Sequence, residues 1–406
     1  MNSLSNPGEA RGRSHRAAVW GAVLCAASFG VVTCGGGDEV LGPLYTDTGP
    51  PVGEFEWNLP EGFPAPRVPE DNPMTAEKVE LGRHLFYDAR LSANETQSCA
   101  SCHEQPLAFT DGLDRGIGST AEVHPRNSMS LTNIGYQPIL TWANPNMTKL
   151  AVQALVPMFG EDPVELGMSG MEDTLIQRIE SDTTYARLFQ EAYPDDSSVT
   201  IEGITKAIAS FQRTLISGNS RVDQARRGDI TLNDPERLGQ ALFFSERLEC
   251  FHCHGSLMFT GTNDFAGKSA PESEFHNNGL YNLDGSGLYP DPNYGLFVFT
   301  NRPEDMGRFK APTLRNIEFT APYMHDGSVA TLDEVVDHYA AGGRTITEGP
   351  NAGDGSTNPN KSGFVKGFTL TVEERAGLLA YLRALSDGDF ITNPAYRDPW
   401  PGGGGG

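Results

Sequence analysis

The sequence predicts a mostly helical protein made of two similar domains, and three observations support this prediction. The pentapeptide Cys-x-x-Cys-His occurs twice, at 99–103 and 250–254. A similar apolar stretch precedes each pentapeptide. Two Thr-x-x-Glu capping boxes, beginning at Thr331 and Thr371, each open an apolar stripe with helical spacing. With 406 residues, 38% of them apolar, the chain has room for two or three domains.

The two pentapeptides have the attachment signature of c-type haem. Two thiols on one turn can each bond a vinyl group of the porphyrin, and the adjacent imidazole then lies beneath the ring and binds iron. In this interpretation the chain carries two covalent haem c groups. The attaching residues are Cys99, Cys102, Cys250 and Cys253, and the iron ligands are His103 and His254. Zinc binding and a redox dithiol are the alternatives; the wide separation of the motifs disfavours the first, and the repeated histidine disfavours the second.

The N-terminal region predicts export. A short basic leader precedes the uncharged run 17–32, which fits a signal peptide over residues 1–34 better than a membrane-spanning helix. Cys34 follows Val-Val-Thr and precedes glycines, so it is a candidate for lipoprotein processing, and simple cleavage nearby is the alternative. A periplasmic location, with a lipid anchor as the sole expected membrane contact, agrees with haem attachment in an oxidising compartment.

The acidic composition disfavours nucleic acid and anionic lipid as partners. The formal net charge of −23 provides no basic face for nucleic acid or anionic lipid. The charge would steer a basic protein partner, or it would simply keep an exported protein soluble. Residues 35–73 are rich in Gly, Pro, Asp and Glu, and predict a flexible linker. Residues 391–406, which end in a run of glycines, predict a flexible tail.

An internal duplication supports two domains. The segment 81–91 recurs as 238–248, with Leu, Gly, Leu, Phe, Arg and Leu at the same offsets. Each copy precedes a pentapeptide, and each pentapeptide is followed by Phe-Thr. These repeats predict two cytochrome-c-like domains at 74–228 and 229–390. The apolar residues predicted to pack on the haems from the first helix of each domain are Leu81, Leu85, Phe86, Leu238, Leu242 and Phe243.

Two further helices and one long loop follow from the pattern. The buried stripe after Thr371 is expected to comprise Val372, Ala376, Leu379, Leu382 and Leu385. The buried stripe after Thr331 is expected to comprise Leu332, Val335, Val336 and Tyr339. Residues 341–363 are rich in Gly, Asn and Pro and are too long for a bare connection, so they predict a functional loop or lid.

The segments 309–316, Phe-Lys-Ala-Pro-Thr-Leu-Arg-Asn, and 320–327, Thr-Ala-Pro-Tyr-Met-His-Asp-Gly, carry a family resemblance. Together with the haem motifs, they resemble the bacterial di-haem cytochrome c peroxidase and MauG superfamily over residues 74 to 390. His-Pro-Arg-Asn at 124–127 and the segment 275–282 are most similar to the MbnH branch, which pairs with a copper-binding partner and oxidises a tryptophan in it. The resemblance implies two cytochrome-c-like domains, each with one covalent c-type haem, joined by a calcium-bearing interface.

The resemblance also implies the second ligand of each iron. Peroxidases of the family carry a methionine fourteen residues after the equivalent of His325, and MauG-like members carry tyrosine; this chain has Tyr339. Tyr339 is therefore the expected ligand of the second haem iron, with an ordinary core tyrosine as the alternative. Peroxidases place a distal histidine where this chain has Ser119. The resemblance favours an open first haem, and ligation by His124, five residues further on, is the alternative.

Three catalytic residues follow from the resemblance. Gln153 and Glu165 match the family's distal pair, which moves a proton during cleavage of hydrogen peroxide; Glu161 competes with Glu165 because an insertion can be aligned in two ways. Trp142 matches the tryptophan between the two haems, and an indole can relay an oxidising equivalent. The residues that match an interdomain calcium site are Asn127, Thr320 and Pro322, the last two through backbone carbonyls.

These features favour a peroxide-dependent oxidase that withdraws electrons from a protein side chain, expected to be tryptophan, of a partner by long-range electron transfer. The partner could be a copper-binding periplasmic protein. The runner-up is a peroxidase that reduces hydrogen peroxide with electrons from a small redox protein. Tyr339 and Ser119 disfavour it, because tyrosinate lowers the potential of a haem. An electron-transfer cytochrome without catalysis is the third possibility and would need two six-coordinate irons.

Overall fold

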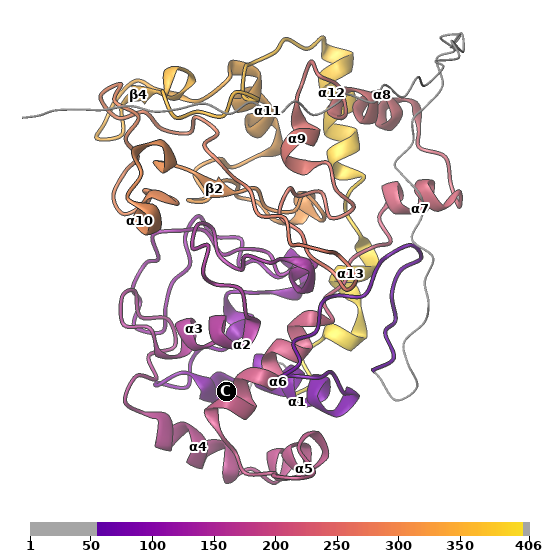
Figure 1. Ribbon diagram of the computed structural model, residues 1–406, viewed down its shortest axis with the longest axis vertical. Helices are drawn as coiled ribbons and strands as arrows, with labels where there is room; N and C mark the ends of the chain where they lie inside the picture. Colours follow the sequence, from indigo (N-terminus) through magenta and orange to yellow (C-terminus); the bar gives the residue numbers. More distant parts are fainter. Residues whose placement is uncertain (1–54, 401–406) are drawn as a thin grey trace, which may run out of the picture. The chain divides into compact units, whose positions relative to one another are not determined.

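The computed structural model describes residues 55–400 (Figure 1). The helices of the first half of the chain are α1 (Ala76–Phe86), α2 (Leu150–Gln153), α3 (Leu155–Phe159), α4 (Glu172–Glu180), α5 (Thr183–Ala192), α6 (Ile201–Arg213) and α7 (Arg221–Arg227). Those of the second half are α8 (Asp234–Phe243), α9 (Cys250–His254), α10 (Phe297–Thr300), α11 (Leu332–Ala341), α12 (Val372–Arg383) and α13 (Gly388–Thr392). Two antiparallel ribbons pair β1 (Phe275–His276) with β2 (Phe309–Lys310), and β3 (Thr345–Ile346) with β4 (Gly353–Asp354).

The duplicated Leu-Gly of the sequence marks two close helix crossings. α1 packs on α6 and α8 packs on α12, and both pairs can be followed in Figure 1. A Cβ atom at Gly82 of α1 would lie 1.9 Å from the carbonyl oxygen of Ala207. A Cβ atom at Gly239 of α8 would lie 2.0 Å from that of Gly377. Glycine recurs at this offset because each crossing brings two backbones into contact.

Two hydrophobic cores organise the described part of the chain. The first is built around α1, α4, α5 and α6, and the second around α8, α11 and α12. The predicted change of domain between residues 228 and 229 falls in the connection between α7 and α8. α7 nevertheless places Val222 in the second core, and its Asp223 pairs with the buried Arg315 at 2.7 Å. α7 therefore packs with the second half of the chain.

The two predicted capping boxes are present. Thr331 and Thr371 each accept a hydrogen bond from the backbone N–H of the glutamate three residues on, and that glutamate bonds back. In α11, Leu332 and Val336 are buried as expected, while Val335 and Tyr339 are half-buried and line a cavity.

The predicted stripe of α12 is partly wrong. Val372 is 82% exposed and Ala376 is also exposed, whereas Leu379, Leu382 and Leu385 are buried. α12 crosses α8 at Gly377, which rotates the buried face toward Leu378 and Tyr381. Leu238 of α8, expected to be buried, is 38% exposed for the same reason, since its side chain lies beside Gly377 at the edge of this crossing.

The predicted linker ends too late, and the predicted tail begins too early. Within the linker range 35–73, residues 55–73 pack on the body: Pro64 accepts a hydrogen bond from the Tyr136 hydroxyl at 2.8 Å, and Arg67 pairs with Asp264 at 2.7 Å. Within the tail range 391–406, residues 391–400 pack on the first core, where the Trp400 indole donates to the His84 carbonyl at 3.1 Å. Apolar side chains in both segments cover the core, which polar composition alone does not reveal.

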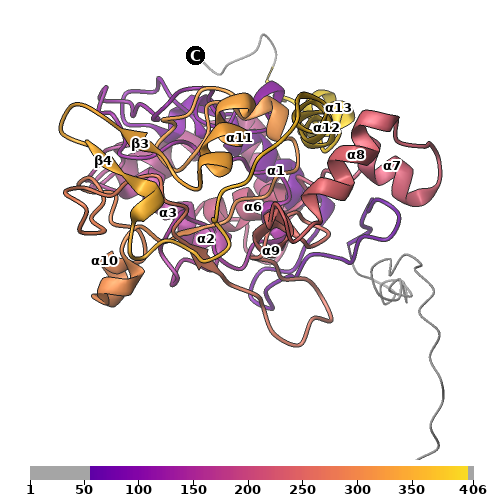
Figure 2. The ribbon, with the colours of Figure 1, turned by 90° about the horizontal axis from the view of Figure 1, so that it is seen from above.

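The segment 341–363 is an ordered hairpin. β3 and β4 pair at its centre, and Figure 2 shows them beside α11. Arg344 N–H donates to the Gly279 carbonyl at 2.9 Å, and the Asn358 amide donates to the Tyr281 carbonyl at 2.8 Å. The hairpin is therefore fixed against the loop that follows β1. A functional role of this segment, as a loop or lid, stays a prediction.

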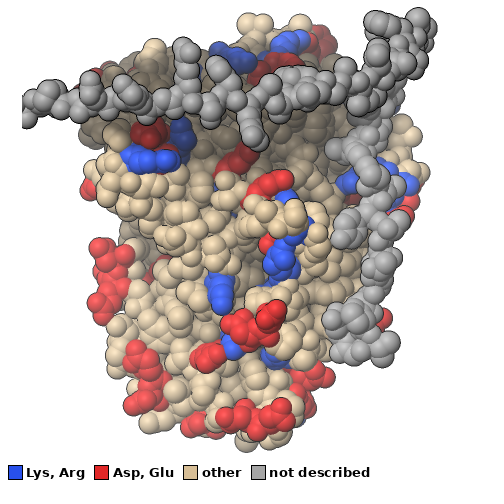
Figure 3. Space-filling model, viewed as in Figure 1, with Lys and Arg blue, Asp and Glu red and all other residues tan. Residues whose placement is uncertain are grey.

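The charge distribution matches the acidic composition. On the face shown in Figure 3, acidic side chains gather most densely at the end of the molecule that holds α4 and α5. The predicted signal peptide 1–34, the candidate Cys34 and the first part of the linker lie outside the described residues. Within residues 55–400, no helix is both long enough and apolar enough to span a bilayer.

Candidate functional site

The second pentapeptide forms α9 at the edge of a cavity of about 240 Å³. Cys250, Cys253 and His254 line this cavity. Nδ1 of His254 donates to the carbonyl oxygen of Phe259 at 3.1 Å, which leaves Nε2 for a metal. Burial lowers the pKa of His254 to about 4, so the imidazole is neutral, the form that binds iron.

Tyr339 of α11 lines the same cavity as His254. Burial raises the pKa of the Tyr339 phenol to about 12, and a hydrogen bond with Asn278 acts in the opposite direction. Without a metal the phenol is therefore protonated at neutral pH. A ferric ion would favour the phenolate, because metal binding releases the proton of its ligand.

The remaining lining of the cavity fits a haem. Most of it is apolar: Phe243, Leu248, Leu314, Leu332, Val336 and Leu382. Lys310 is buried in this lining, where its ammonium donates to the Ile139 carbonyl at 2.7 Å, and burial lowers its pKa to about 7. His325 is also buried, and its Nε2 has no hydrogen-bond partner. Burial of the Lys310 ammonium without a carboxylate, and of His325 Nε2 without a hydrogen bond, costs free energy in an empty cavity. The propionates of a haem would be suitable partners for both groups.

The first pentapeptide shares with the second the hydrogen bond that orients its histidine. Cys99–Ser101 form a 3-10 turn, and Nδ1 of His103 donates to the carbonyl oxygen of Phe109 at 2.8 Å. Phe109 and Phe259 both have positive φ, 62° and 50°. This strained conformation turns each carbonyl toward its histidine. The Phe-Thr that follows each pentapeptide in the sequence is the local signal for this role.

The cysteines do not have the properties of a reactive dithiol. Burial raises the pKa of each of the four motif thiols to about 12, whereas disulfide exchange needs the thiolate. Among the described residues, these cysteines join no group of three or more His, Cys, Asp or Glu ligand atoms that come together. The apolar surroundings suit thioether bonds to a porphyrin.

Glu165 lies at the first pentapeptide, and Glu161 does not. The charge of Glu165 acts on both Cys99 and Cys102, and burial raises its pKa to about 7. Glu161 is exposed and accepts a hydrogen bond from Ser169 at 2.7 Å. Gln153 ends α2 and is half-buried; among the described residues its side chain makes no hydrogen bond. Of the two glutamates, Glu165 is therefore the one near the first pentapeptide.

His124 lies beside Glu165, which the sequence could not show. Its Nδ1 is 3.9 Å from Glu165 Oε1, and its buried Nε2 has no hydrogen-bond partner. Ser119 lies in the same region and binds Glu165 through the backbone, where its N–H donates to the Glu165 carbonyl at 2.7 Å.

Trp142 connects segments from the two halves of the site. Its indole Nε1 donates to the Asn127 carbonyl at 2.9 Å, and its own carbonyl accepts from Lys310 N–H at 2.8 Å. Trp142 lines the cavity with Tyr339, and the same cavity is bordered by Thr110, which closely follows the first pentapeptide. This position is suitable for a relay between two haems.

The three residues expected to bind calcium also border this cavity. The Asn127 amide nitrogen donates to the Leu113 carbonyl at 2.8 Å, so its side-chain oxygen is the atom available to a cation. Thr320 and Pro322 follow one another closely in the chain and offer backbone carbonyls. Oxygen atoms of these kinds are the ligands that calcium prefers, and calcium binding at these residues stays a prediction.

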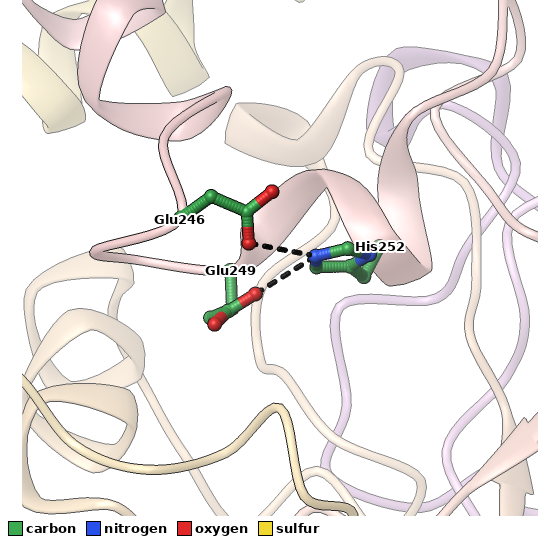
Figure 4. Close-up of side chains that lie close together, drawn as sticks. All are labelled: Glu246, Glu249 and His252. Atoms are coloured by element: carbon green, nitrogen blue, oxygen red, sulfur yellow. Dashed lines mark hydrogen bonds and ion pairs between the residues drawn. The ribbon is translucent and has the colours of Figure 1, made fainter.

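One further group of ligand-capable side chains lies next to α9 (Figure 4). Nε2 of His252 is 2.8 Å from Glu249 and 3.4 Å from Glu246. Lys366 binds the other oxygen of Glu249 at 2.7 Å, and this hydrogen bond lowers the pKa of that carboxyl. The His252 ring stacks on Phe364 with 4.2 Å between the ring centroids. We interpret this group as an ion-pair network, because the protein already compensates its charges.

Comparisons with known proteins agree with this site. Residues 76–231 match the family model described as di-haem cytochrome c peroxidase. The chain is 29% identical to the methylamine utilization protein MauG of Methylorubrum extorquens, over 90% of this chain and 93% of that protein. It is 32% identical to the cytochrome-c peroxidase IdrP1 of Denitromonas iodatirespirans, over 95% of both.

A solved structure is more similar still. It is a MauG-like protein associated with microbial copper homeostasis, 49% identical, with a TM-score of 0.84 over 86% of this chain and all of that one. The family uses two haem c cofactors, which the two pentapeptides and their surroundings fit. The chain belongs to the di-haem cytochrome c peroxidase family, which includes MauG, and is an oxidoreductase of that family.

Proposed function

We propose that the protein uses hydrogen peroxide to oxidise a side chain, tryptophan by preference, in a partner protein that does not enter the haem site. The observation that carries this proposal is the position of Tyr339 in one cavity with His254. A histidine–phenolate pair would hold the second haem at low potential, which suits storage of an oxidising equivalent and not acceptance of electrons from a donor. The 49% identity to a MauG-like protein supports the same assignment.

The residues of the chain have separate roles in this proposal. Haem, held by the two pentapeptides, supplies the redox chemistry. Glu165 carries a proton between the two oxygens of peroxide, because a carboxyl with a pKa of about 7 is present in both forms at neutral pH. Gln153 would hold the leaving oxygen. Trp142 relays electrons between the two centres, and the Asn127 carbonyl fixes the orientation of its indole N–H.

The partner is proposed to be a small exported protein that binds copper, and its residue is oxidised through long-range electron transfer. The solved MauG-like structure associated with copper homeostasis is the basis for copper. A periplasmic location, with or without a lipid at Cys34, follows from the leader sequence. A calcium ion at Asn127, Thr320 and Pro322 would complete the site.

A second candidate is a peroxidase that reduces hydrogen peroxide with electrons from a small redox protein. The relative named cytochrome-c peroxidase, similar over nearly the whole chain, favours it. The two functions differ in the order of events. A peroxidase of this type needs prior reduction of one haem, whereas the proposed oxidase reacts from the fully ferric state.

The test is to add hydrogen peroxide to the ferric holoprotein without a reductant. We expect a long-lived state that retains both oxidising equivalents, followed by a mass change at one tryptophan when the proposed partner, a small exported copper-binding protein, is added. Reaction only after addition of one electron per protein would support the peroxidase. Two low-spin, six-coordinate irons with no peroxide reaction would leave an electron-transfer cytochrome.

A further inference from the structure

The loop that carries His124 contacts the backbone of Val164 and Glu165 at three points. Ser119 N–H donates to the Glu165 carbonyl at 2.7 Å, and the Glu122 carboxylate accepts from Val164 N–H at 2.7 Å. A Cβ atom on Gly118 would lie 1.9 Å from the Val164 carbonyl, so the two loops are in direct backbone contact. The position of Glu165 relative to this loop is therefore set by the backbone.

His124 places its imidazole beside the Glu165 carboxylate, where these two loops meet. Its Nδ1 lies 3.9 Å from Glu165 Oε1, a distance that a small side-chain rotation closes to a hydrogen bond. The other charged groups that act on it are Asp111 and Glu122, and Asp111 accepts a hydrogen bond from Ser128 at 2.6 Å. The side chain of His124 is 17% exposed and that of Glu165 is 31% exposed, while the Nε2 of His124 is buried without a partner. An unpaired buried nitrogen beside a partly accessible edge is a position that a water molecule would fill.

The stoichiometry of peroxide reduction requires a supply of protons at this site. One hydrogen peroxide, two electrons and two protons give two molecules of water. A carboxyl group holds one proton, so Glu165 has to be reloaded within every turnover. The electrons come from the partner, whereas both protons come from solvent and must reach the same oxygen-binding side of the first haem.

We infer that His124 is the positioning residue that passes protons from solvent to Glu165. The proton enters at Nε2 through a water molecule, leaves from Nδ1 and binds to Glu165 Oε1, which then delivers it to the peroxide-derived oxygen. His124 acts through Glu165 and is not a ligand of the first iron. This inference rests on the proposed function, because it takes Glu165 as the acid–base group.

The test compares His124→Asn with the parent holoprotein by stopped-flow spectroscopy. Asparagine keeps a polar group near the position of Nδ1 but cannot carry a proton from one side to the other. We expect an unchanged resting spectrum, an unchanged first reaction with peroxide, and a return to the resting state, on addition of an electron donor, that is about 10²-fold slower. Proton uptake, followed with a pH-indicator dye, should slow by the same factor.

Two variants serve as controls. His84→Asn changes another imidazole paired with a glutamate, since Nδ1 of His84 lies 3.3 Å from Glu80 on α1, and it should leave both phases unchanged. His124→Ala should be slow as well, and added imidazole should restore its second phase. If His124 had only a structural role, added imidazole would not restore the rate of the second phase.

Three outcomes would overturn the inference. If His124→Asn returns to the resting state as fast as the parent, His124 is not a proton relay. A change in the spin state of the resting first haem in His124→Asn would make His124 an iron ligand. Absence of rescue by imidazole would assign the loss to folding. If instead Glu165→Gln reacts with peroxide at the parent rate, the acid–base assignment of the proposed function fails, and it does so independently of His124.

Discussion

The indole nitrogen of Trp142 donates a hydrogen bond to the backbone carbonyl of Asn127, with 2.9 Å between the two atoms. Asn127 is also the residue whose side-chain oxygen is expected to bind calcium. One asparagine therefore joins the candidate relay to the candidate metal site, and a change at either is expected to reach the other.

Replacement of Trp142 by phenylalanine should abolish the relay while leaving the fold intact. Phenylalanine fills most of the same space but is much harder to oxidise. We expect both haems to be retained and the ferric protein to react with peroxide, but the long-lived two-electron state should decay at least tenfold faster. Stopped-flow spectra report its lifetime. Trp57→Phe is the control, because Trp57 packs on Phe55 in the N-terminal segment; an equal effect in both variants would argue against a relay at Trp142.

Removal of calcium should act through the same hydrogen bond. Treatment with a chelator would remove the contact of the Asn127 side-chain oxygen and leave only the hydrogen bond to Leu113, so the carbonyl that orients Trp142 would be held less firmly. We expect a shorter lifetime of the two-electron state and its recovery when calcium is restored. Asn127→Ala should behave like the chelated protein and resist recovery. The exposed Asn146→Ala is the control. If the chelator leaves the lifetime unchanged, the assignment of calcium to this site is wrong.

Substitution of Tyr339 should change the second haem alone. Tyr339→Met replaces an anionic oxygen with a neutral sulfur, so the reduction potential of that haem should rise by on the order of 0.1 V or more. Potentiometric titration of the holoprotein measures this change. Tyr323→Phe removes a hydroxyl from the lining of the same cavity and should leave the potential unaltered. A potential that is the same in Tyr339→Met would show that Tyr339 is a core tyrosine.

The sequence could predict those features that depend on neighbours in the chain. The pentapeptides, the capping boxes at Thr331 and Thr371, and the recurrence of glycine at 82 and 239 are all local patterns. The family resemblance added Trp142, whose role no local pattern reveals.

Contacts between distant segments could not be predicted in the same way. His124 and Glu165 meet because the backbones of two loops are in contact. The sequence of neither loop predicts this contact. Trp400 lies in a segment with the composition of a tail, yet it packs on the first core. The exposure of Val372 depends on where α12 crosses α8, which a stripe of apolar residues does not determine.

The reaction with peroxide should depend on pH through Glu165. Burial raises the pKa of this carboxyl to about 7, so the carboxylate that accepts the first proton of peroxide becomes populated as the pH rises through about 7. We expect the rate to increase over this range and then to level off. Glu165→Gln should be slower by about 10²-fold or more and lose this dependence. Glu161→Gln should keep the parent profile, and the reverse pattern would exchange the roles of the two glutamates.

The two helix crossings give a prediction about stability that has an unusual sign. Glycine to alanine in a helix normally stabilises a protein by about 0.5–1 kcal/mol, because alanine loses less entropy on folding. At Gly82 and Gly239 the added methyl group would lie 1.9 Å and 2.0 Å from a backbone carbonyl, which cannot rotate away as a side chain would. The paired helices would have to move apart, and the free energy of unfolding should fall by about 1–3 kcal/mol, the usual range for overpacking.

Thermal unfolding of the holoprotein tests this prediction. Gly388→Ala is the control, since Gly388 also lies in a helix, as the first residue of α13, but an added Cβ atom there meets nothing within 4 Å. It should unfold at the parent temperature or slightly above, while Gly82→Ala and Gly239→Ala unfold below it. Because each crossing belongs to one core, the two variants should destabilise the protein by similar amounts. An unfolding temperature as high as that of the control at both positions would mean that the crossings are looser than the structure shows.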